Sequence, residues 1–269
     1  MSGCDVLVEG ARYAYGDLEA LRGVTLAVRA GESVALLGPN GAWKTTLTRL
    51  LVALLRPGAG RVVVGDWDVA RKRPDEMAQR VGYLFQHADQ QLFARSVKED
   101  VAFGPRRLAR SDGPVAAVLE ELGLAAVAAV HPYDVPPPVR KLVALAGVLA
   151  MEPCVLVLDE PTAGLDRAQR DVVIAALRRR AANGVTVLAV SHDIGFVAET
   201  VDRVVVMRAG RIAADRAARG LLYDSETLAA LGLRPPAAVA VGVALGLAGA
   251  PIRTSECADA LRGRQWRLI

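Results

Sequence analysis

The segment GPNGAWKTT, at residues 38–46, has the spacing of a phosphate-binding loop. In that pattern a glycine is followed by four residues, a second glycine, a lysine and a serine or threonine, and backbone N–H groups of the turn surround a phosphate. Gly38, Lys44 and Thr45 fit the pattern, whereas Trp43 replaces the second glycine. A β-rich run before the loop and a helical pattern after it disfavour the alternative, a glycine-rich turn that binds nothing. The segment predicts a nucleotide site with one altered residue.

Length and composition are those of a folded protein. The 269 residues suffice for one large domain, or for one domain with an insert and a tail. Hydrophobic residues make up 52% of the chain but aromatic residues only 4%, so Ala, Val and Leu must form most of the core. The formal charge of +4 is spread along the chain. Solvated helix faces explain this mild excess better than a nucleic-acid surface does, and we expect no nucleic-acid partner.

The cysteines and the apolar segments indicate in which cellular compartment the protein is expected. Cys4, Cys154 and Cys257 are far apart and lack metal-binding spacing. Cys154 adjoins an apolar strand and is predicted to be a core residue, and the odd number of cysteines favours a reducing compartment. The first residues lack the charged head and apolar run of a signal peptide. The longest apolar tract, residues 237–250, is too short to predict a membrane span.

The order of predicted elements indicates an α/β protein. The first part of the chain reads as short strands, and the segment from about residue 90 to residue 150 reads as helices. Strands then return, because residues 155–158 and 185–190 are continuous apolar runs typical of strands buried on both faces. The last fifty residues are rich in alanine. We therefore predict an α/β core with a helical insertion and a C-terminal appendage.

Two carboxylates follow the apolar strand at residues 155–158. Asp159 can hold Mg²⁺ through water, and Glu160 can polarise an attacking water molecule. A turn at the strand end is the structural alternative, since aspartate and proline favour turns. Because the pair accompanies a phosphate loop, we interpret it as part of the nucleotide site.

A histidine follows the next buried strand. His192, in the sequence SHD at residues 191–193, could contact a γ-phosphate as a hydrogen-bonding sensor. A single histidine after a strand is more often structural, so this interpretation depends on the other motifs. His87 and His131 have no such support, and we expect them at the surface.

Four motifs occur in one order: GPNGAWKTT at 38–46, FQ at 85–86, LDEPTAGLD at 158–166 and SHD at 191–193. Their order and spacing resemble the ATP-binding subunit of ABC transporters over roughly residues 5–215. The resemblance implies a P-loop NTPase core of the α/β class with an antiparallel β subdomain. It also implies a nucleotide-binding domain at residues 1–220, with a helical subdomain at about 88–150, and a small C-terminal appendage at 221–269.

The resemblance further implies roles in binding ATP and Mg²⁺. Tyr15 matches the aromatic residue that stacks on adenine; Tyr13 is the less favoured choice, and a strand aromatic is the alternative for either. Residues 163–166 match the loop that crosses the dimer interface. The implied nucleotide contacts are Tyr15, Gly38, Asn40, Gly41, Lys44, Thr45 and Thr46. The implied metal contacts are Thr45, Gln86 and Asp159, and the implied catalytic residues are Glu160 as the base, His192 as the sensor and Gln86, which also couples to the membrane partner.

A narrower resemblance covers almost the whole chain. Residues 86–105 (QHADQQLFARSVKEDVAFGP), 145–153 and 231–236 look like segments of the cobalt and energy-coupling-factor importers, which take up metal ions or vitamins. In that group two ATP-binding subunits dimerise beneath a transmembrane coupling subunit. The resemblance implies both kinds of partner, with either a homodimer or a heterodimer, and a cytoplasmic position on the inner face of the cell membrane.

Trp43 is the first departure from the family pattern. Its indole must point into the phosphate cradle, into the packed core, or out through a distorted turn. Overpacking costs about 1–3 kcal/mol, and displaced phosphate contacts would add to that cost. The alternative is that the loop rearranges and still binds phosphate.

The second departure lies in the signature loop, LSGGQ in the family, which binds the γ-phosphate held by the other subunit. Counting back from VALAG at residues 143–147, the aligned segment is VPPPV at residues 135–139. Pro136, Pro137 and Pro138 offer no N–H groups, although proline suits the first turn of a helix. The change therefore keeps the fold and removes hydrogen-bond donors. The alternative is that the helix dipole and partner residues suffice to bind the γ-phosphate.

These departures leave two functions open. Each site in such a dimer combines one subunit's phosphate loop with the other's signature loop, so no pairing gives this chain a fully intact site. We expect slow or absent turnover by the chain alone. It is either an ATP-hydrolysing importer subunit or a non-catalytic subunit that dimerises with an active ATPase and docks the membrane protein. A soluble ABC protein acting on nucleic acid is disfavoured, since no second nucleotide domain or long coiled insert is visible.

Overall fold

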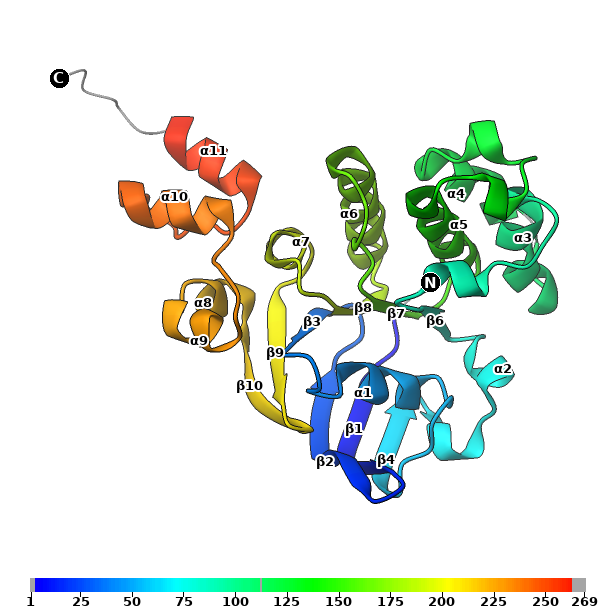
Figure 1. Cartoon of the computed structure of the whole chain (residues 1–269), viewed down its shortest axis with the longest axis horizontal. Coiled ribbons are helices and arrows are strands. Elements are labelled where there is room, and N and C mark those ends of the chain that lie inside the picture. Colours follow the sequence, from blue (N-terminus) through cyan, green and yellow to red (C-terminus); the bar gives the residue numbers. More distant parts are fainter. Residues whose placement is uncertain (1–2, 112, 263–269) are drawn as a thin grey trace.

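The computed structural model describes residues 3–111 and 113–262, whose strands form two sheets (Figure 1). The smaller sheet is antiparallel, with the strand order β2-β1-β4-β5. Its strands are β1 (Val6–Tyr15), β2 (Leu18–Val28), β4 (Ala59–Val64) and β5 (Trp67–Asp68). This sheet is the antiparallel β subdomain that the family resemblance implies.

The larger sheet has six strands in the order β10-β9-β3-β8-β7-β6, and only β10 runs antiparallel. Every residue of β3, β6, β7 and β8 is buried, which explains their continuous apolar runs. Because the parallel strands share a direction, their carboxyl ends meet at one edge. The strands are β3 (Ser33–Leu37), β6 (Val81–Leu84), β7 (Val155–Asp159), β8 (Thr186–Val190), β9 (Arg203–Arg208) and β10 (Arg211–Ala217).

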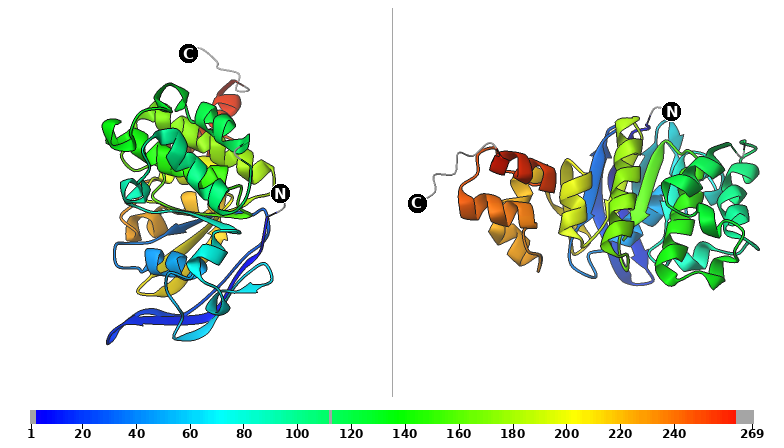
Figure 2. Two further views of the ribbon diagram at one scale, coloured as in Figure 1. Left: turned by 90° about the vertical axis from the view of Figure 1, so that its right-hand side faces the viewer. Right: turned by 90° about the horizontal axis from the view of Figure 1, so that it is seen from above.

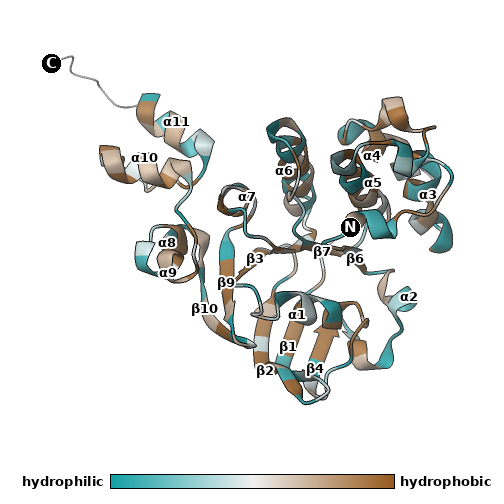
Figure 3. Ribbon diagram, viewed as in Figure 1, coloured by the Kyte–Doolittle hydropathy of each residue, from teal (hydrophilic) through white to brown (hydrophobic). Residues whose placement is uncertain are grey.

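Helix α1 (Lys44–Leu51) lies between the two sheets (Figure 1). Leu47, Leu50 and Leu51 are fully buried in a cluster that includes apolar residues of both sheets. The other face of the large sheet is covered by α6 (Arg167–Ala182) and α7 (Ile194–Thr200). Figure 3 shows hydrophobic residues following the strands of both sheets. The phosphate-loop segment is thus held between two packed layers.

The helical insertion lies beside β6 at one end of the sheet, and the C-terminal helices lie at the other end (Figure 2). Ser96 accepts a hydrogen bond from the backbone N–H of Glu99 and so caps the first long helix of the insertion. The remaining helices are α2 (Pro74–Met77), α3 (Val97–Arg107), α4 (Gly113–Glu121), α5 (Pro137–Ala150), α8 (Ala218–Leu222), α9 (Ser225–Ala230), α10 (Ala237–Leu245) and α11 (Thr254–Arg262), with 3₁₀ turns at Val69–Arg71, Ala88–Gln91, Ala125–Val127 and Pro132–Asp134.

The C-terminal part consists of short helices. The boundary predicted at residue 220 falls inside α8, whose Leu221 and Leu222 belong to the main core, so the division into domains stays a prediction. The apolar tract at residues 237–250 contains α10, a helix of nine residues. Over the part of the chain that the structure describes, no helix has the length and apolar character needed to cross a membrane.

A disulfide joins Cys4 to Cys154. The sequence predicted Cys154 as a core residue, and it is buried, but the cysteine pattern also favoured a reducing compartment, and the Cys4–Cys154 bridge does not fit that expectation. The pairing could not be read from the sequence because 150 positions separate the two residues. The bridge ties the segment before β1 to the start of β7, and Cys257 remains a buried free thiol.

Reduction of this bridge should lower the free energy of unfolding by about 2–4 kcal/mol, because a cross-link across so long a loop restricts the unfolded chain. Urea unfolding with and without a reductant measures the effect, and Cys4→Ser should abolish it while Cys257→Ala should not. The unfolded, unreduced protein should titrate with one free thiol. A count of three would contradict the bridge.

Candidate functional site

The phosphate-loop segment leaves β3 at the carboxyl edge of the large sheet. Gly38 has φ +148°, and a Cβ built there would lie 2.2 Å from the carbonyl oxygen of Met207, so only glycine fits. Gly41 has φ +78° and an open surrounding, as a left-handed turn residue. Asn40 is exposed in the same turn. The chain therefore turns sharply from β3 into the amino end of α1.

Lys44 opens α1 with its side chain folded back over the loop. Its Nζ donates to the carbonyl oxygen of Gly38 at 2.7 Å and to that of Pro39 at 3.1 Å. Burial lowers the pKa of the Lys44 ammonium, while the nearby carboxylates of Glu160 and Asp159 raise it. A buried cation at the amino end of a helix suits an anionic ligand.

Thr45 and Asp159 connect the loop to the end of β7. The Thr45 hydroxyl donates to Asp159 Oδ2 at 2.7 Å. Burial raises the pKa of the Asp159 carboxyl, and the Thr45 hydrogen bond and the charge of Lys44 oppose that shift. Two oxygen ligands of the kind that Mg²⁺ prefers thus lie in direct contact.

Glu160 and His192 lie beside this pair, after β7 and β8. The His192 backbone N–H donates to Glu160 Oε2 at 3.3 Å, and its Nε2 lies 3.5 Å from Oε1. Oε1 is buried and accepts no hydrogen bond from the residues described. Burial raises the pKa of the Glu160 carboxyl, against the effect of His192. A carboxylate with a free oxygen and a raised pKa is suited to accept a proton from water.

The other predicted residues have less contact with this group. Gln86 is exposed after β6 and forms no hydrogen bond within the described residues. The side chain that holds the end of β6 is Gln91. Its amide oxygen accepts from the Phe85 N–H at 3.0 Å, and its amide nitrogen donates to the Tyr83 carbonyl at 3.1 Å. Gln91 lies in the segment at residues 86–105 that resembles the importers, but the sequence assigned it no role. His87 and His131 are exposed, as expected.

Trp43 adopts a left-handed backbone conformation with φ 69°, as the residue before α1. Its indole packs against the core next to the small sheet and lies 5.8 Å from the Tyr15 ring, centroid to centroid. Of the three directions considered for the indole, the structure shows the one into the packed core. The left-handed conformation is costly for a side chain of this size.

The segment aligned with the signature loop begins α5. Pro136 is the N-cap residue, and Pro137 and Pro138 occupy the first two helical positions. From the cap to the third helical residue, only Val139 therefore carries a backbone N–H. No side chain caps this helix, and its first turn contains no acidic residue. The fold is kept and most of the donors are missing.

Lys141, on the second turn of α5, is a residue that the sequence patterns did not single out. Its Nζ donates to the carbonyl oxygens of Glu160 at 3.0 Å and Ala163 at 2.7 Å. Burial lowers the pKa of this ammonium. The Lys141 side chain links the helical insertion to the segment after β7. A pattern of apolar residues cannot reveal such a contact.

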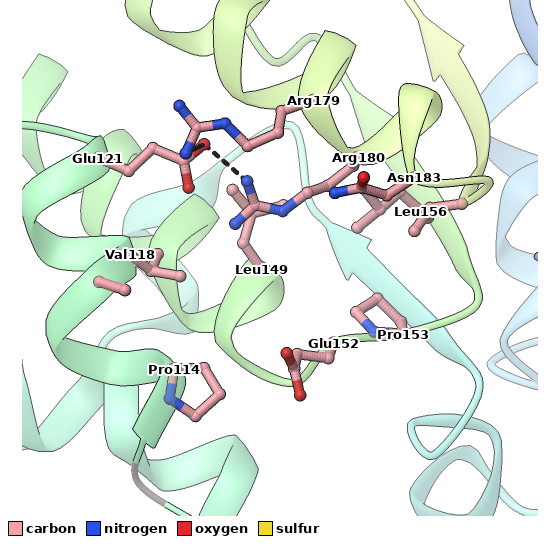
Figure 4. Close-up of a pocket in the computed structure, with 12 residues that line it drawn as sticks. Pro114, Val118, Glu121, Leu149, Glu152, Pro153, Leu156, Arg179, Arg180 and Asn183 are labelled. Carbon is pink, nitrogen blue, oxygen red and sulfur yellow. Dashed lines mark hydrogen bonds and ion pairs between the residues drawn. The ribbon is translucent and has the colours of Figure 1, made fainter. Parts of the chain in front are cut away.

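A pocket of about 300 Å³ lies away from these residues, between α4, α5 and α6 (Figure 4). Arg180 donates to Glu121 at 2.6 Å across it. Pro153 and Val185, which precede β7 and β8, place it at the amino ends of the strands. The pocket is therefore at the opposite edge of the sheet from the phosphate-loop segment.

Comparison with known proteins agrees with this geometry. The profile of the ABC transporter family matches residues 21–163. The chain is 44% identical over 236 residues to the cobalt import ATP-binding protein CbiO of Rhodobacter capsulatus, a match that covers 85% of this chain and 84% of that protein. It is 40% identical over 257 residues to the energy-coupling factor transporter ATP-binding protein EcfA2 of Symbiobacterium thermophilum, covering 93% and 84%.

A solved structure extends the similarity to the fold. The structure of cbiO1 from Clostridium perfringens, described as part of the ABC transporter complex cbiONQ, matches with a TM-score of 0.73 and 31% identity over 90% of this chain and 98% of that one. The motifs, the overall fold and the relatives agree. The chain belongs to the ABC transporter family, as one of its ATP-binding cassettes.

Proposed function

We propose that this protein is the ATP-binding subunit of a cobalt- or energy-coupling-factor-type importer, which it energises by binding and hydrolysing Mg-ATP at a dimer interface. The hydrogen bond from Thr45 to Asp159 carries the proposal, because it joins the phosphate loop to the acidic strand end. The CbiO and EcfA2 relatives are named for cobalt import and for an energy-coupling factor transporter.

Magnesium would be held mainly by the nucleotide. The described residues contain no group of three or more His, Cys, Asp or Glu side chains placed to bind a metal. Mg²⁺ commonly takes one or two protein oxygens, with phosphates and water completing its shell. Thr45 and Asp159 supply such oxygens, and Gln86 would join them only if the exposed segment after β6 moves inward.

The hydrolytic step would depend on Glu160. We assign it the role of base toward water, His192 that of a hydrogen-bonding contact to the γ-phosphate, and Lys44 that of the main phosphate contact. Gly38, Asn40 and Gly41 of the loop and Thr46 of α1 would surround the phosphates.

Partners and location follow from the same group of relatives. We propose a second ABC subunit, identical or different, and a transmembrane coupling subunit beneath which the pair would sit at the inner face of the membrane. No nucleic-acid partner is part of this proposal.

A non-catalytic role is the second candidate. The three prolines at the start of α5 favour it, because they deny N–H donors to the opposite site. Such a subunit would dimerise with a competent ATPase and dock the coupling protein. The free oxygen of Glu160, in contact with His192, favours the catalytic role.

Titration calorimetry of the full chain with Mg-ATP tests the proposal. We expect saturable binding to one site per chain, weakened at least about tenfold by Lys44→Ala, because a buried charge-assisted contact contributes about 1.5–3 kcal/mol. Lys98→Ala, an exposed lysine on α3, is the matched control and should bind as the unmodified chain does. Absence of binding by the unmodified chain would refute the proposed function.

A further inference from the structure

An aromatic cluster borders the phosphate loop. The ring centroids of Tyr15 and Trp43 are 5.8 Å apart with planes inclined by 31°, and Tyr13 meets Tyr15 edge-on at 4.9 Å. Tyr15 keeps 40% of its surface exposed although it touches two other rings. In a chain with only 4% aromatic residues, three rings at one end of α1 form an unusual concentration.

The cluster starts where the phosphates would lie. The Tyr15 hydroxyl and Thr46 Oγ1 are 3.3 Å apart, and Trp43 directly precedes Lys44 in the loop. The indole is partly buried against the core and lies beside the exposed Tyr15 ring, whereas the Lys44 ammonium turns toward the carbonyls of Gly38 and Pro39. A planar group joined to a phosphate in this loop is therefore within reach of the two rings.

The arrangement of the rings suits a flat ligand. The Tyr15 and Trp43 planes are inclined by only 31° with centroids 5.8 Å apart, and Trp43 is half-buried while Tyr15 is exposed, so a flat ligand can lie against the pair. Stacking of one base on an aromatic side chain typically changes affinity by roughly fivefold to a hundredfold. A purine, with two fused rings, can cover more of this surface than a pyrimidine.

We propose that Trp43, together with Tyr15, forms a two-ring surface that stacks on the base of the bound nucleotide and favours purine nucleotides. The residue that interrupts the glycine pattern would then strengthen binding at the base and offset a weaker hold of the loop on the phosphates. This inference rests on the proposed function, since it requires that the loop binds a nucleotide.

Affinity measurements on Trp43 variants test this role. With ATP, CTP and inorganic tripolyphosphate as Mg²⁺ complexes, Trp43→Ala should weaken ATP binding about tenfold, CTP binding less, and tripolyphosphate binding not at all. Trp43→Phe should recover most of the affinity for ATP. Equal or tighter ATP binding by Trp43→Ala would overturn the inference while leaving the proposed function intact. Failure of the unmodified chain to bind either ATP or tripolyphosphate would overturn both.

Fluorescence provides a second readout that needs no alanine variant. In Trp67→Phe/Trp266→Phe protein, Trp43 is the remaining tryptophan. A base stacked on the indole should quench its emission, so ATP should quench in proportion to occupancy and tripolyphosphate should not. The matched control, Trp43→Phe/Trp266→Phe, reports Trp67, which lies under Arg80 and Lys72, and should not respond. Equal quenching of Trp43 by both ligands would contradict stacking.

Discussion

Replacing Pro136, Pro137 and Pro138 with Ser, Gly and Gly should raise the rate of ATP hydrolysis at least about tenfold. The replacement restores backbone N–H groups and a hydroxyl at the amino end of α5, where only Val139 now offers an N–H. Loss of a single well-placed donor to developing charge typically lowers the rate about 10²- to 10³-fold. The gain is limited because glycine weakens the first turn of the helix.

Steady-state phosphate release measures this effect. Replacement of Pro235 and Pro236 by alanine is the matched control, because it removes prolines that precede α10, in the C-terminal part of the chain. That variant should hydrolyse ATP at the unmodified rate. If the Ser-Gly-Gly protein binds ATP and folds normally but gains no activity, missing donors are not what limits turnover.

Glu160→Gln should lower hydrolysis by about 10²- to 10⁴-fold, the usual contribution of a general base. The effect is best measured in the Ser-Gly-Gly background, where the starting rate is higher. Glutamine keeps the size of the side chain and an acceptor oxygen, so ATP binding should be preserved. Glu152→Gln, at the turn between α5 and β7 on the opposite edge of the sheet, is the control. An unchanged rate in Glu160→Gln would favour the non-catalytic role.

Features that depend on local pattern were predictable from the sequence. The continuous apolar run at residues 155–158 identified a buried strand, and the spacing from Gly38 to Thr45 placed the turn between β3 and α1. The three prolines were expected to suit the first turn of a helix, and α5 begins at Pro137. Asp159 and Glu160 then lie near the loop because parallel strands end at the same edge.

Contacts between residues that are far apart in the sequence were not predictable. The Cys4–Cys154 bridge, the bonds from Lys141 to the segment after β7, and the direction of the Trp43 indole each join residues whose proximity is set by packing. The pattern at residues 38–46 showed that Trp43 was out of place. The position of the Trp43 side chain, beside the Tyr15 ring, is seen only in the structure.

We infer that this chain has a competent phosphate loop and a deficient signature segment. Mixing two proteins tests it directly: the unmodified chain, and a Ser-Gly-Gly variant that also carries Lys44→Ala. Each alone should hydrolyse ATP slowly, the first for lack of signature donors and the second for lack of the loop lysine. In a mixed dimer, the unmodified loop would face the restored segment. We predict a rate at least about tenfold above the sum of the separate proteins, and a rate equal to that sum would contradict the account.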